Sequence, residues 1–152
     1  LCFFLYSILN QNETNKPASK LDEELQADWQ NDLLFVKAKA IEEKKPILMY
    51  FTGSNWCSAC IRLNKEIFSK PFFIDYANEH LVLMKVDFPL GVQQKESLIN
   101  QNNQLYDDYE IASLPTVIVL DSDREIYREA GYGRGTPKDY VAFLKSLFPE
   151  KM

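Results

Sequence analysis

Two cysteines separated by two small residues are the groups in this chain best suited to chemistry, in the sequence Trp-Cys-Ser-Ala-Cys at residues 56–60. The apolar run at residues 46–51 precedes them and fits a buried strand. If a helix begins after that strand, Cys57 lies at its N-terminus, where free backbone N–H groups and the helix dipole favour a thiolate. The pKa of a cysteine, about 8.5 when unperturbed, falls to about 3.5–7.5 at such positions. We therefore expect Cys57 to be a nucleophile.

Cys60 follows three residues later, on nearly the same face of that helix and at a separation that a disulfide spans. It can attack a mixed disulfide formed at Cys57. The pair can therefore cycle between a dithiol and a disulfide.

Two other interpretations of the cysteine pair remain open. A structural zinc site needs about four ligands, and outside the pair the chain offers Cys2 and His80, so such a site would need a dimer or carboxylates. A structural disulfide that closes so short a loop would stabilise the fold only weakly. We favour a redox-active pair that uses neither a metal nor another cofactor.

Composition predicts one domain with a tail. The chain has 152 residues, 46% of them hydrophobic and 13% aromatic, which is enough for a single core. Its formal net charge of −5 and lack of Lys and Arg clusters argue against a nucleic-acid partner. Three cysteines are too few for a disulfide-stapled scaffold, so their number leaves the cellular compartment open.

The N-terminal residues indicate export. Residues 1–9 are apolar almost throughout and give way to a polar stretch at residues 10–20. A membrane span needs about 20 apolar residues, so residues 1–9 resemble half of a signal peptide or of an N-terminal anchor. We expect a periplasmic or otherwise extracytoplasmic protein, either freed from its leader or anchored through its N-terminus. Residues 1–20 are then leader and linker, and residues 21–152 the folded domain.

Hydrophobic periodicity and helix breakers predict the elements of that domain. In chain order, we expect a helix at 21–44, a strand at 47–52, a helix from Cys57 that Pro71 interrupts, a strand at 81–88, a helix at 93–109, a strand run at 111–120, a strand at 125–129 and a helix from Thr136 to about 148. The last two strands should form a hairpin. Pro115 lies early in its strand run, where it removes a ladder donor and indicates an edge or a special bond.

At this point the chain resembles the thioredoxin superfamily. Residues 56–60 match its Trp-Cys-x-x-Cys motif, and Leu114-Pro115-Thr116 matches its cis-proline loop. Residues 51–56 and 86–89 resemble the exported bacterial group that includes the chlamydial DsbH oxidoreductases. The resemblance implies an α/β thioredoxin-like fold, with a central mixed β-sheet flanked by helices and preceded by an N-terminal helix.

The resemblance also assigns roles to residues. It implies that Pro115 forms a cis peptide bond against the sulfur of Cys57, that the backbone around Leu114 and Pro115 pairs with an extended substrate, and that Trp56 flanks the same surface. An ordinary edge proline and a packing tryptophan are the simpler interpretations. The implied activity is protein-disulfide exchange. Its partners would be protein or peptide disulfides and a membrane thiol-disulfide electron donor.

Two departures from the family pattern are visible. Thioredoxins carry a buried Asp in the strand before the motif, but residues 49–51 are Met-Tyr-Phe, so the deprotonation of Cys60 must use water or a group that the sequence does not identify. Residues 91–103 form a longer segment than their thioredoxin counterpart. We interpret this segment as a rim adapted to a particular partner.

The direction of the reaction depends on what stabilises the Cys57 anion. Ser58 and Ala59 bring neither a charge nor an imidazole between the cysteines. We therefore expect moderate thiolate stabilisation and a fairly reducing potential, hence a reductase. The competing hypothesis is a thioredoxin-shaped module that binds peptides, or assists maturation, without using its cysteines.

Overall fold

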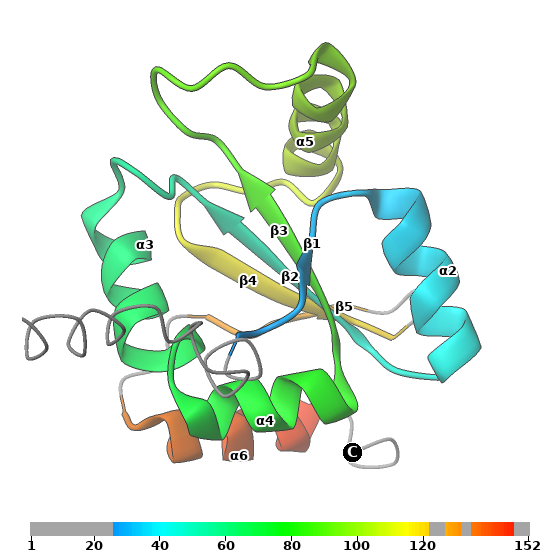
Figure 1. The fold of residues 1–152 in the computed structure, drawn as a ribbon, viewed down its shortest axis with the longest axis vertical. Coiled ribbons are helices and arrows are strands. Elements are labelled where there is room, and N and C mark those ends of the chain that lie inside the picture. Colours follow the sequence, from blue (N-terminus) through cyan, green and yellow to red (C-terminus); the bar gives the residue numbers. More distant parts are fainter. Residues whose placement is uncertain (1–25, 122–126, 132–134, 148–152) are drawn as a thin grey trace, which may run out of the picture.

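The computed structural model describes residues 26–121, 127–131 and 135–147, which form a sheet covered by helices (Figure 1). The leader and linker predicted at residues 1–20, including Cys2, lie outside the described residues. The elements in chain order are β1 (Trp29–Gln30), α2 (Leu33–Glu43), β2 (Ile47–Thr52), α3 (Ser58–Leu63), the π-helix η1 (Asn64–Phe68), α4 (Pro71–His80), β3 (Val82–Asp87), α5 (Glu96–Asp108), β4 (Thr116–Leu120), β5 (Tyr127–Glu129) and α6 (Pro137–Leu147).

The five strands form one mixed sheet in the order β1-β3-β2-β4-β5. Strand β3 runs parallel to both β1 and β2, whereas β4 is antiparallel to β2 and to β5. Strand β2 is therefore central, paired on both sides along its length. The antiparallel pairing of β4 with β5 confirms the predicted hairpin, whose turn lies outside the described residues.

The two faces of β2 supply two separate cores, because side chains alternate along a strand. Leu48 and Tyr50 face a cluster formed with α3, η1, α4 and α6. Ile47, Met49 and Phe51 face a second cluster formed with α2 and α5. In Figure 1, α3, α4 and α6 accordingly lie on one side of the sheet and α2 and α5 on the other. The predicted thioredoxin-like α/β architecture is confirmed.

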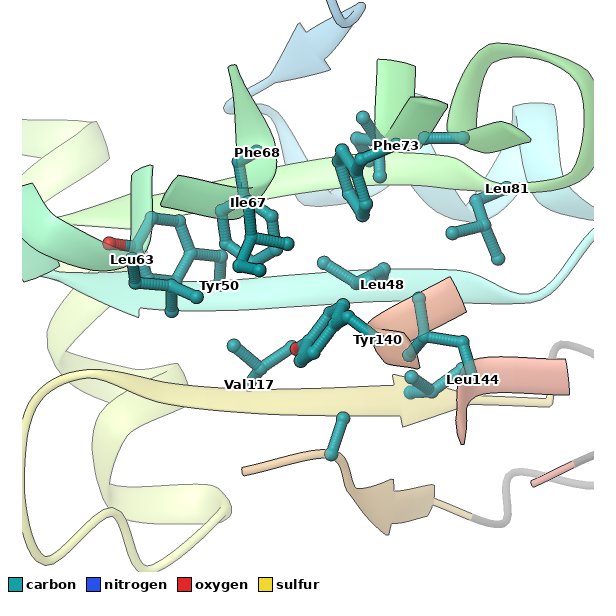
Figure 2. Packing of buried hydrophobic residues seen from close by; sticks show 14 of the residues in the cluster. Leu48, Tyr50, Leu63, Ile67, Phe68, Phe73, Leu81, Val117, Tyr140 and Leu144 are labelled. Carbon is teal, nitrogen blue, oxygen red and sulfur yellow. The ribbon is translucent and has the colours of Figure 1, made fainter. Parts of the chain in front are cut away.

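Aromatic rings fill the first core. Phe68 of η1 lies at its centre, with ring centroids 5.4 Å from Trp29, 5.0 Å from Tyr50, 4.7 Å from Phe73 and 5.8 Å from Tyr140. Figure 2 shows the Phe68 and Phe73 side chains on the same face of the sheet as Leu48 of β2, with Tyr140 reaching in from α6. The π-helix positions Phe68 so that α3 and α4 share one core.

The N-terminal part of the domain differs from the prediction. A helix over residues 21–44 was expected, but the helix begins only at Leu33, where the Asp32 side chain caps it by accepting from the Phe35 N–H at 2.9 Å. Trp29 belongs instead to β1, which pairs with the edge of β3. The periodicity of the sequence was correct for the burial of Trp29 but not for its backbone, because an unpaired strand edge next to it favours extended pairing.

The helix α5 shows a second difference. It was expected over residues 93–109, but it begins at Glu96. Asn102, a polar residue within it, is 1% exposed. The Asn102 side chain donates to the carbonyl oxygen of Asp87 at 3.1 Å, which satisfies a polar backbone group at the end of β3.

Several local predictions are confirmed. Pro71 interrupts the helix that starts after Cys57 and occupies the first position of α4. The backbone N–H of Asp139 donates to the Thr136 hydroxyl at 3.3 Å, and the Thr136 N–H donates to the Asp139 carboxylate at 2.8 Å, so the two residues form a capping box before α6. The Thr136 hydroxyl also donates to the Asp139 carboxylate at 2.7 Å, and this bond, followed by the one from the Thr136 N–H, lowers the pKa of Asp139.

Removing the Phe68 ring tests the role of the aromatic core. Because Phe68 is 1% exposed and contacts four other rings, Phe68→Ala should lower the free energy of unfolding by about 3–5 kcal/mol. Phe72→Ala is the matched control, since Phe72 is 50% exposed, and should cost less than about 1 kcal/mol. Denaturant unfolding measures both values, and equal losses would contradict this description of the core.

Candidate active site

The cysteine pair lies at the start of α3, after the loop that connects β2 to this helix. Strand β2 ends at Thr52, and Cys57 is the N-cap of α3, with its backbone N–H donating to the Gly53 carbonyl at 2.9 Å. The Cys57 sulfur accepts the Cys60 N–H at 3.2 Å. Such an N–H bond to sulfur also stabilises a thiolate, so this geometry favours a reactive sulfur at Cys57.

Cys57 and Cys60 are joined by a disulfide, with their Cα atoms 5.2 Å apart. The two residues differ in accessibility: Cys57 is 8% exposed and Cys60 1%. Cys57 is therefore the more accessible of the two residues, although both are largely buried. A pair with this difference in accessibility is suited to thiol-disulfide exchange.

The loop between β2 and α3 is bonded to the end of β3 and to the chain that follows it. Ser54 donates from its backbone N–H at 3.0 Å and from its hydroxyl at 2.5 Å to the two carboxylate oxygens of Asp87. The Asn55 side chain donates to the Leu90 carbonyl at 2.8 Å and accepts the Leu90 N–H at 3.0 Å. These bonds fix the loop that leads to the cysteines. None of them was predicted from the sequence.

The Trp56 ring is positioned by contacts to Phe88 and to Gly53. Its indole N–H donates to the Phe88 carbonyl at 2.7 Å, and 47% of the residue remains exposed beside Cys57 in the chain. Gly53 makes room for the ring, because a Cβ at this position would lie 2.6 Å from Trp56 Nε1. The need for a glycine at this position appears only in the structure, where the loop folds the Trp56 ring over residue 53.

The Leu114–Pro115 peptide bond is cis, as the family resemblance implied. Strand β4 starts at the next residue, and its Thr116 pairs with Phe51 near the end of β2. Leu114 packs against the core cluster that contains both cysteines. Figure 1 shows the start of β4 and the start of α3 at the same end of the sheet, so the structure brings the predicted substrate-binding segment and the cysteine pair to one edge.

Tyr50 and Thr52 lie beneath the cysteines, where thioredoxins have a carboxylate. Tyr50 is 2% exposed, and its hydroxyl donates to the Cys60 carbonyl at 3.0 Å and accepts the Thr52 hydroxyl at 3.0 Å. Burial raises the pKa of Tyr50, while the bond from Thr52 opposes the shift. Tyr50 was expected only as part of the apolar run at residues 46–51, so this contact was not predicted.

The described residues show neither a metal-binding cluster nor a membrane-spanning helix, but they do form a pocket. Among the described residues, no three His, Cys, Asp or Glu side chains gather as they would around a metal ion, and no helix is long and apolar enough to cross a bilayer. A hollow of about 270 Å³ beside β1 and α5 contains none of the predicted site residues. It is lined by Trp29, Gln30, Asn31, Lys85, Asp87, Gln94, Leu98 and Asn102.

The fold, the Trp-Cys-x-x-Cys turn and the cis-proline loop define a thioredoxin-like protein, and the family comparison agrees. The family model described as a thioredoxin-like domain matches residues 36–147, so the chain belongs to the thioredoxin-like family.

Within this family the chain is similar to chlamydial Dsb proteins. It is 31% identical over 105 residues to the disulfide bond reductase DsbH of Chlamydia pneumoniae, a match that covers 69% of this chain and 63% of DsbH. It is 32% identical over 109 residues to the thioredoxin-related protein DsbJ of the same organism, covering 71% of this chain and 31% of DsbJ. The chain thus matches less than two thirds of the length of either relative.

Solved structures extend the similarity. A DsbH oxidoreductase superposes with a TM-score of 0.76 at 25% identity, covering 92% of this chain and 96% of that one. A thioredoxin from Thermus thermophilus, at 16% identity and a TM-score of 0.59, covers 80% of this chain and 87% of its own, and shares the fold. The resemblance to the DsbH group is confirmed.

The packing of Gly53 under Trp56 gives a prediction about stability. Gly53→Ala should force the rigid indole away from the Phe88 carbonyl and lower the free energy of unfolding by about 1–3 kcal/mol. In a Trp56→Ala background, Gly53→Ala should lower the free energy of unfolding much less, since the ring that it would displace is absent. Denaturant unfolding of the four proteins in this double-mutant cycle measures the coupling. An equal loss of unfolding free energy in both backgrounds would contradict the contact between Gly53 and the Trp56 ring.

Proposed function

We propose that this protein is a thiol-disulfide oxidoreductase that reduces disulfides of exported proteins through a Cys57/Cys60 dithiol-disulfide cycle. The observation that carries the proposal is the disulfide at the start of α3, with Cys57 the more exposed sulfur and Cys60 enclosed. Membership of the thioredoxin-like family and similarity to DsbH support it.

The cycle starts from the reduced pair. The Cys57 thiolate attacks one sulfur of a substrate disulfide, which breaks, and the leaving substrate thiolate takes a proton from water. Cys60 then gives its proton to the hydroxide left in the water by the first step, attacks Cys57 Sγ and displaces the second substrate sulfur as a thiolate. The two electrons of the dithiol have passed to the substrate, and the protein is left with the Cys57–Cys60 disulfide.

Substrate binding is assigned to Trp56, Leu114 and Pro115. The exposed indole of Trp56 offers an apolar surface, and residues 114 and 115 precede β4 at the end of the sheet where the cysteines lie. An extended peptide beside residues 114 and 115 would present its disulfide to Cys57 by strand-like pairing. This arrangement favours protein or peptide disulfides over small compact ones.

The reductase direction follows from the surroundings of the cysteines. Ser58 and Ala59 place no charge or imidazole between them, and within the part of the chain that the structure describes a Cys57 thiolate would gain the helix terminus and the Cys60 N–H bond. We further propose an extracytoplasmic location, in keeping with the apolar residues 1–9 and with the similarity to Dsb proteins. Outside the cytoplasm, the oxidised pair would need a membrane thiol-disulfide donor to become reduced again.

Reduction of insulin by dithiothreitol distinguishes this enzyme from a peptide-binding module with idle cysteines. The wild-type protein should accelerate precipitation of the reduced insulin chains, and Cys57→Ser should abolish the acceleration. Cys2→Ser is the matched control, since it removes a cysteine outside the pair. Identical rates of insulin precipitation with wild type and Cys57→Ser would refute the proposed enzymatic activity.

The two cysteines should differ in reactivity. In the reduced protein near neutral pH, Cys57 should be alkylated by iodoacetamide at least tenfold faster than Cys60, because it combines greater exposure with the N-cap position. Peptide mapping by mass spectrometry resolves each site and separates both from Cys2. Equal rates, or a faster Cys60, would remove the basis for naming Cys57 the nucleophile.

Replacing the resolving cysteine should trap the intermediate. A Cys60→Ser variant retains the attacking sulfur but has no thiol to displace the substrate, so mixed disulfides at Cys57 should accumulate. Non-reducing electrophoresis after reaction with a disulfide-containing peptide detects them. The double variant Cys57→Ser/Cys60→Ser is the control, and trapping to the same extent in that variant would count against the mechanism.

A further inference from the structure

The hydroxyl of Tyr50 lies between the central strand and the resolving cysteine. It donates to the Cys60 carbonyl oxygen at 3.0 Å, and the same carbonyl accepts the helical N–H of Asn64. Cys60 is therefore tied both to its own helix and to the sheet. Figure 2 shows the Tyr50 ring extending from β2 toward the helical layer, beside Phe68.

The direction of this hydroxyl is fixed from two sides. The Tyr50 ring is packed against Phe68, with centroids 5.0 Å apart, and against Trp29, at 5.8 Å. The hydroxyl of Thr52, which is 1% exposed and two residues along the same strand face, donates to the Tyr50 oxygen at 3.0 Å. Tyr50 thus directs its own proton to the Cys60 carbonyl.

The contact continues from Cys60 to Cys57. The peptide that carries the Cys60 carbonyl also carries the Ile61 N–H, which donates to the Cys57 carbonyl at 3.0 Å. The chain of bonds runs from Thr52 through Tyr50 and this peptide to the backbone of the nucleophilic cysteine. Linked hydrogen bonds of this kind polarise one another and hold their members in one geometry.

The chemistry of Tyr50 limits its role to positioning. Burial raises the pKa of Tyr50, so the phenol stays neutral where thioredoxins have a carboxylate. A neutral hydroxyl that already donates to a carbonyl does not remove the proton of Cys60. It can, however, set how often the Cys60 sulfur meets Cys57, and an intramolecular attack depends strongly on such alignment.

From this geometry we infer that Tyr50 is a positioning residue for the resolving step, which holds Cys60 in place to attack the mixed disulfide at Cys57. The inference rests on the proposed function for its biological purpose. In the step itself, the Cys60 thiolate forms a bond to Cys57 Sγ, the bond from Cys57 Sγ to the substrate sulfur breaks, and the departing thiolate takes up a proton from water.

The test follows the mixed disulfide with glutathione as probe. Reduced protein is mixed with oxidised glutathione, quenched with acid at intervals, and the species with glutathione on Cys57 is quantified by mass spectrometry. In Tyr50→Phe we expect that species to decay about threefold to tenfold more slowly, the effect of losing one hydrogen bond. Alkylation of Cys57 in the reduced variant should keep its wild-type rate.

Tyr140→Phe is the matched control. Tyr140 is 3% exposed in the same core, contacts Phe68, and donates its hydroxyl to the Gly131 carbonyl at 3.3 Å rather than to Cys60. It should resolve the mixed disulfide at the wild-type rate. Equal decay in Tyr50→Phe and Tyr140→Phe would overturn the inference, and so would a matching loss in the rate of Cys57 alkylation, since that would indicate general loosening of the site.

Thr52→Val decides the matter if Tyr50→Phe does not fold. It removes the donor to the Tyr50 oxygen but keeps the tyrosine, and should slow the decay about twofold or more, whereas Thr52→Ser, which keeps a hydroxyl, should restore the wild-type rate. A wild-type rate in Thr52→Val would then refute the inference. The proposed function can fail separately: a protein that resolves glutathione but leaves insulin intact retains the Tyr50 effect and loses the reductase assignment.

Discussion

The position of the cysteine pair depends on the burial of β2. This strand is paired with β3 on one side and β4 on the other, and both of its faces are covered by core side chains. A strand held in this way has no freedom to shift its register, because a slip of one residue would exchange the two cores. The end of β2 is therefore a fixed point, and the reactive turn begins five residues after it, at Cys57.

Two neighbours of β2 and one of its own residues complete the site around that fixed point. The end of β3 and the chain after it supply the acceptors for Ser54 and Trp56 and both partners for Asn55, so the loop cannot move without breaking contacts to Asp87, Phe88 and Leu90. The start of β4 brings the cis-proline segment to the same edge. Beneath the pair, an uncharged tyrosine replaces the carboxylate of thioredoxins. The exchange chemistry can thus be shared with the family although its polar support differs.

The sequence was sufficient for the parts of the fold that local chemistry determines. The apolar run of β2, the break at Pro71 and the cap at Thr136 each carry their own signal, and all three were predicted. The helix predicted at Trp29 was wrong, and the burial of Asn102 was not predicted, because both depend on β3. Trp29 pairs with Leu83 of that strand, and Asn102 donates to the carbonyl of Asp87, fifteen residues earlier. Burial of an asparagine becomes favourable only when a particular carbonyl needs a donor.

The same limit explains what was missed at the site. The cysteines, Trp56 and Pro115 were recognised because their residue types and spacing have chemical meaning, whereas Asp87 and Tyr50 look like ordinary strand residues. Their roles appear only when β2, β3 and α3 are placed together. The sequence showed that the usual carboxylate was absent, but not that a hydroxyl pair occupied the space.

The central claim is that Cys57 and Cys60 form a reversible pair poised to reduce other disulfides. Equilibrating the protein in dithiothreitol buffers of graded ratio, and quantifying the two cysteine states after acid quenching and alkylation, gives the reduction potential of the pair. The account predicts a single two-electron transition near that of thioredoxin, at about −270 mV. A potential near that of DsbA, at about −120 mV, or a pair that does not exchange at all, would contradict it.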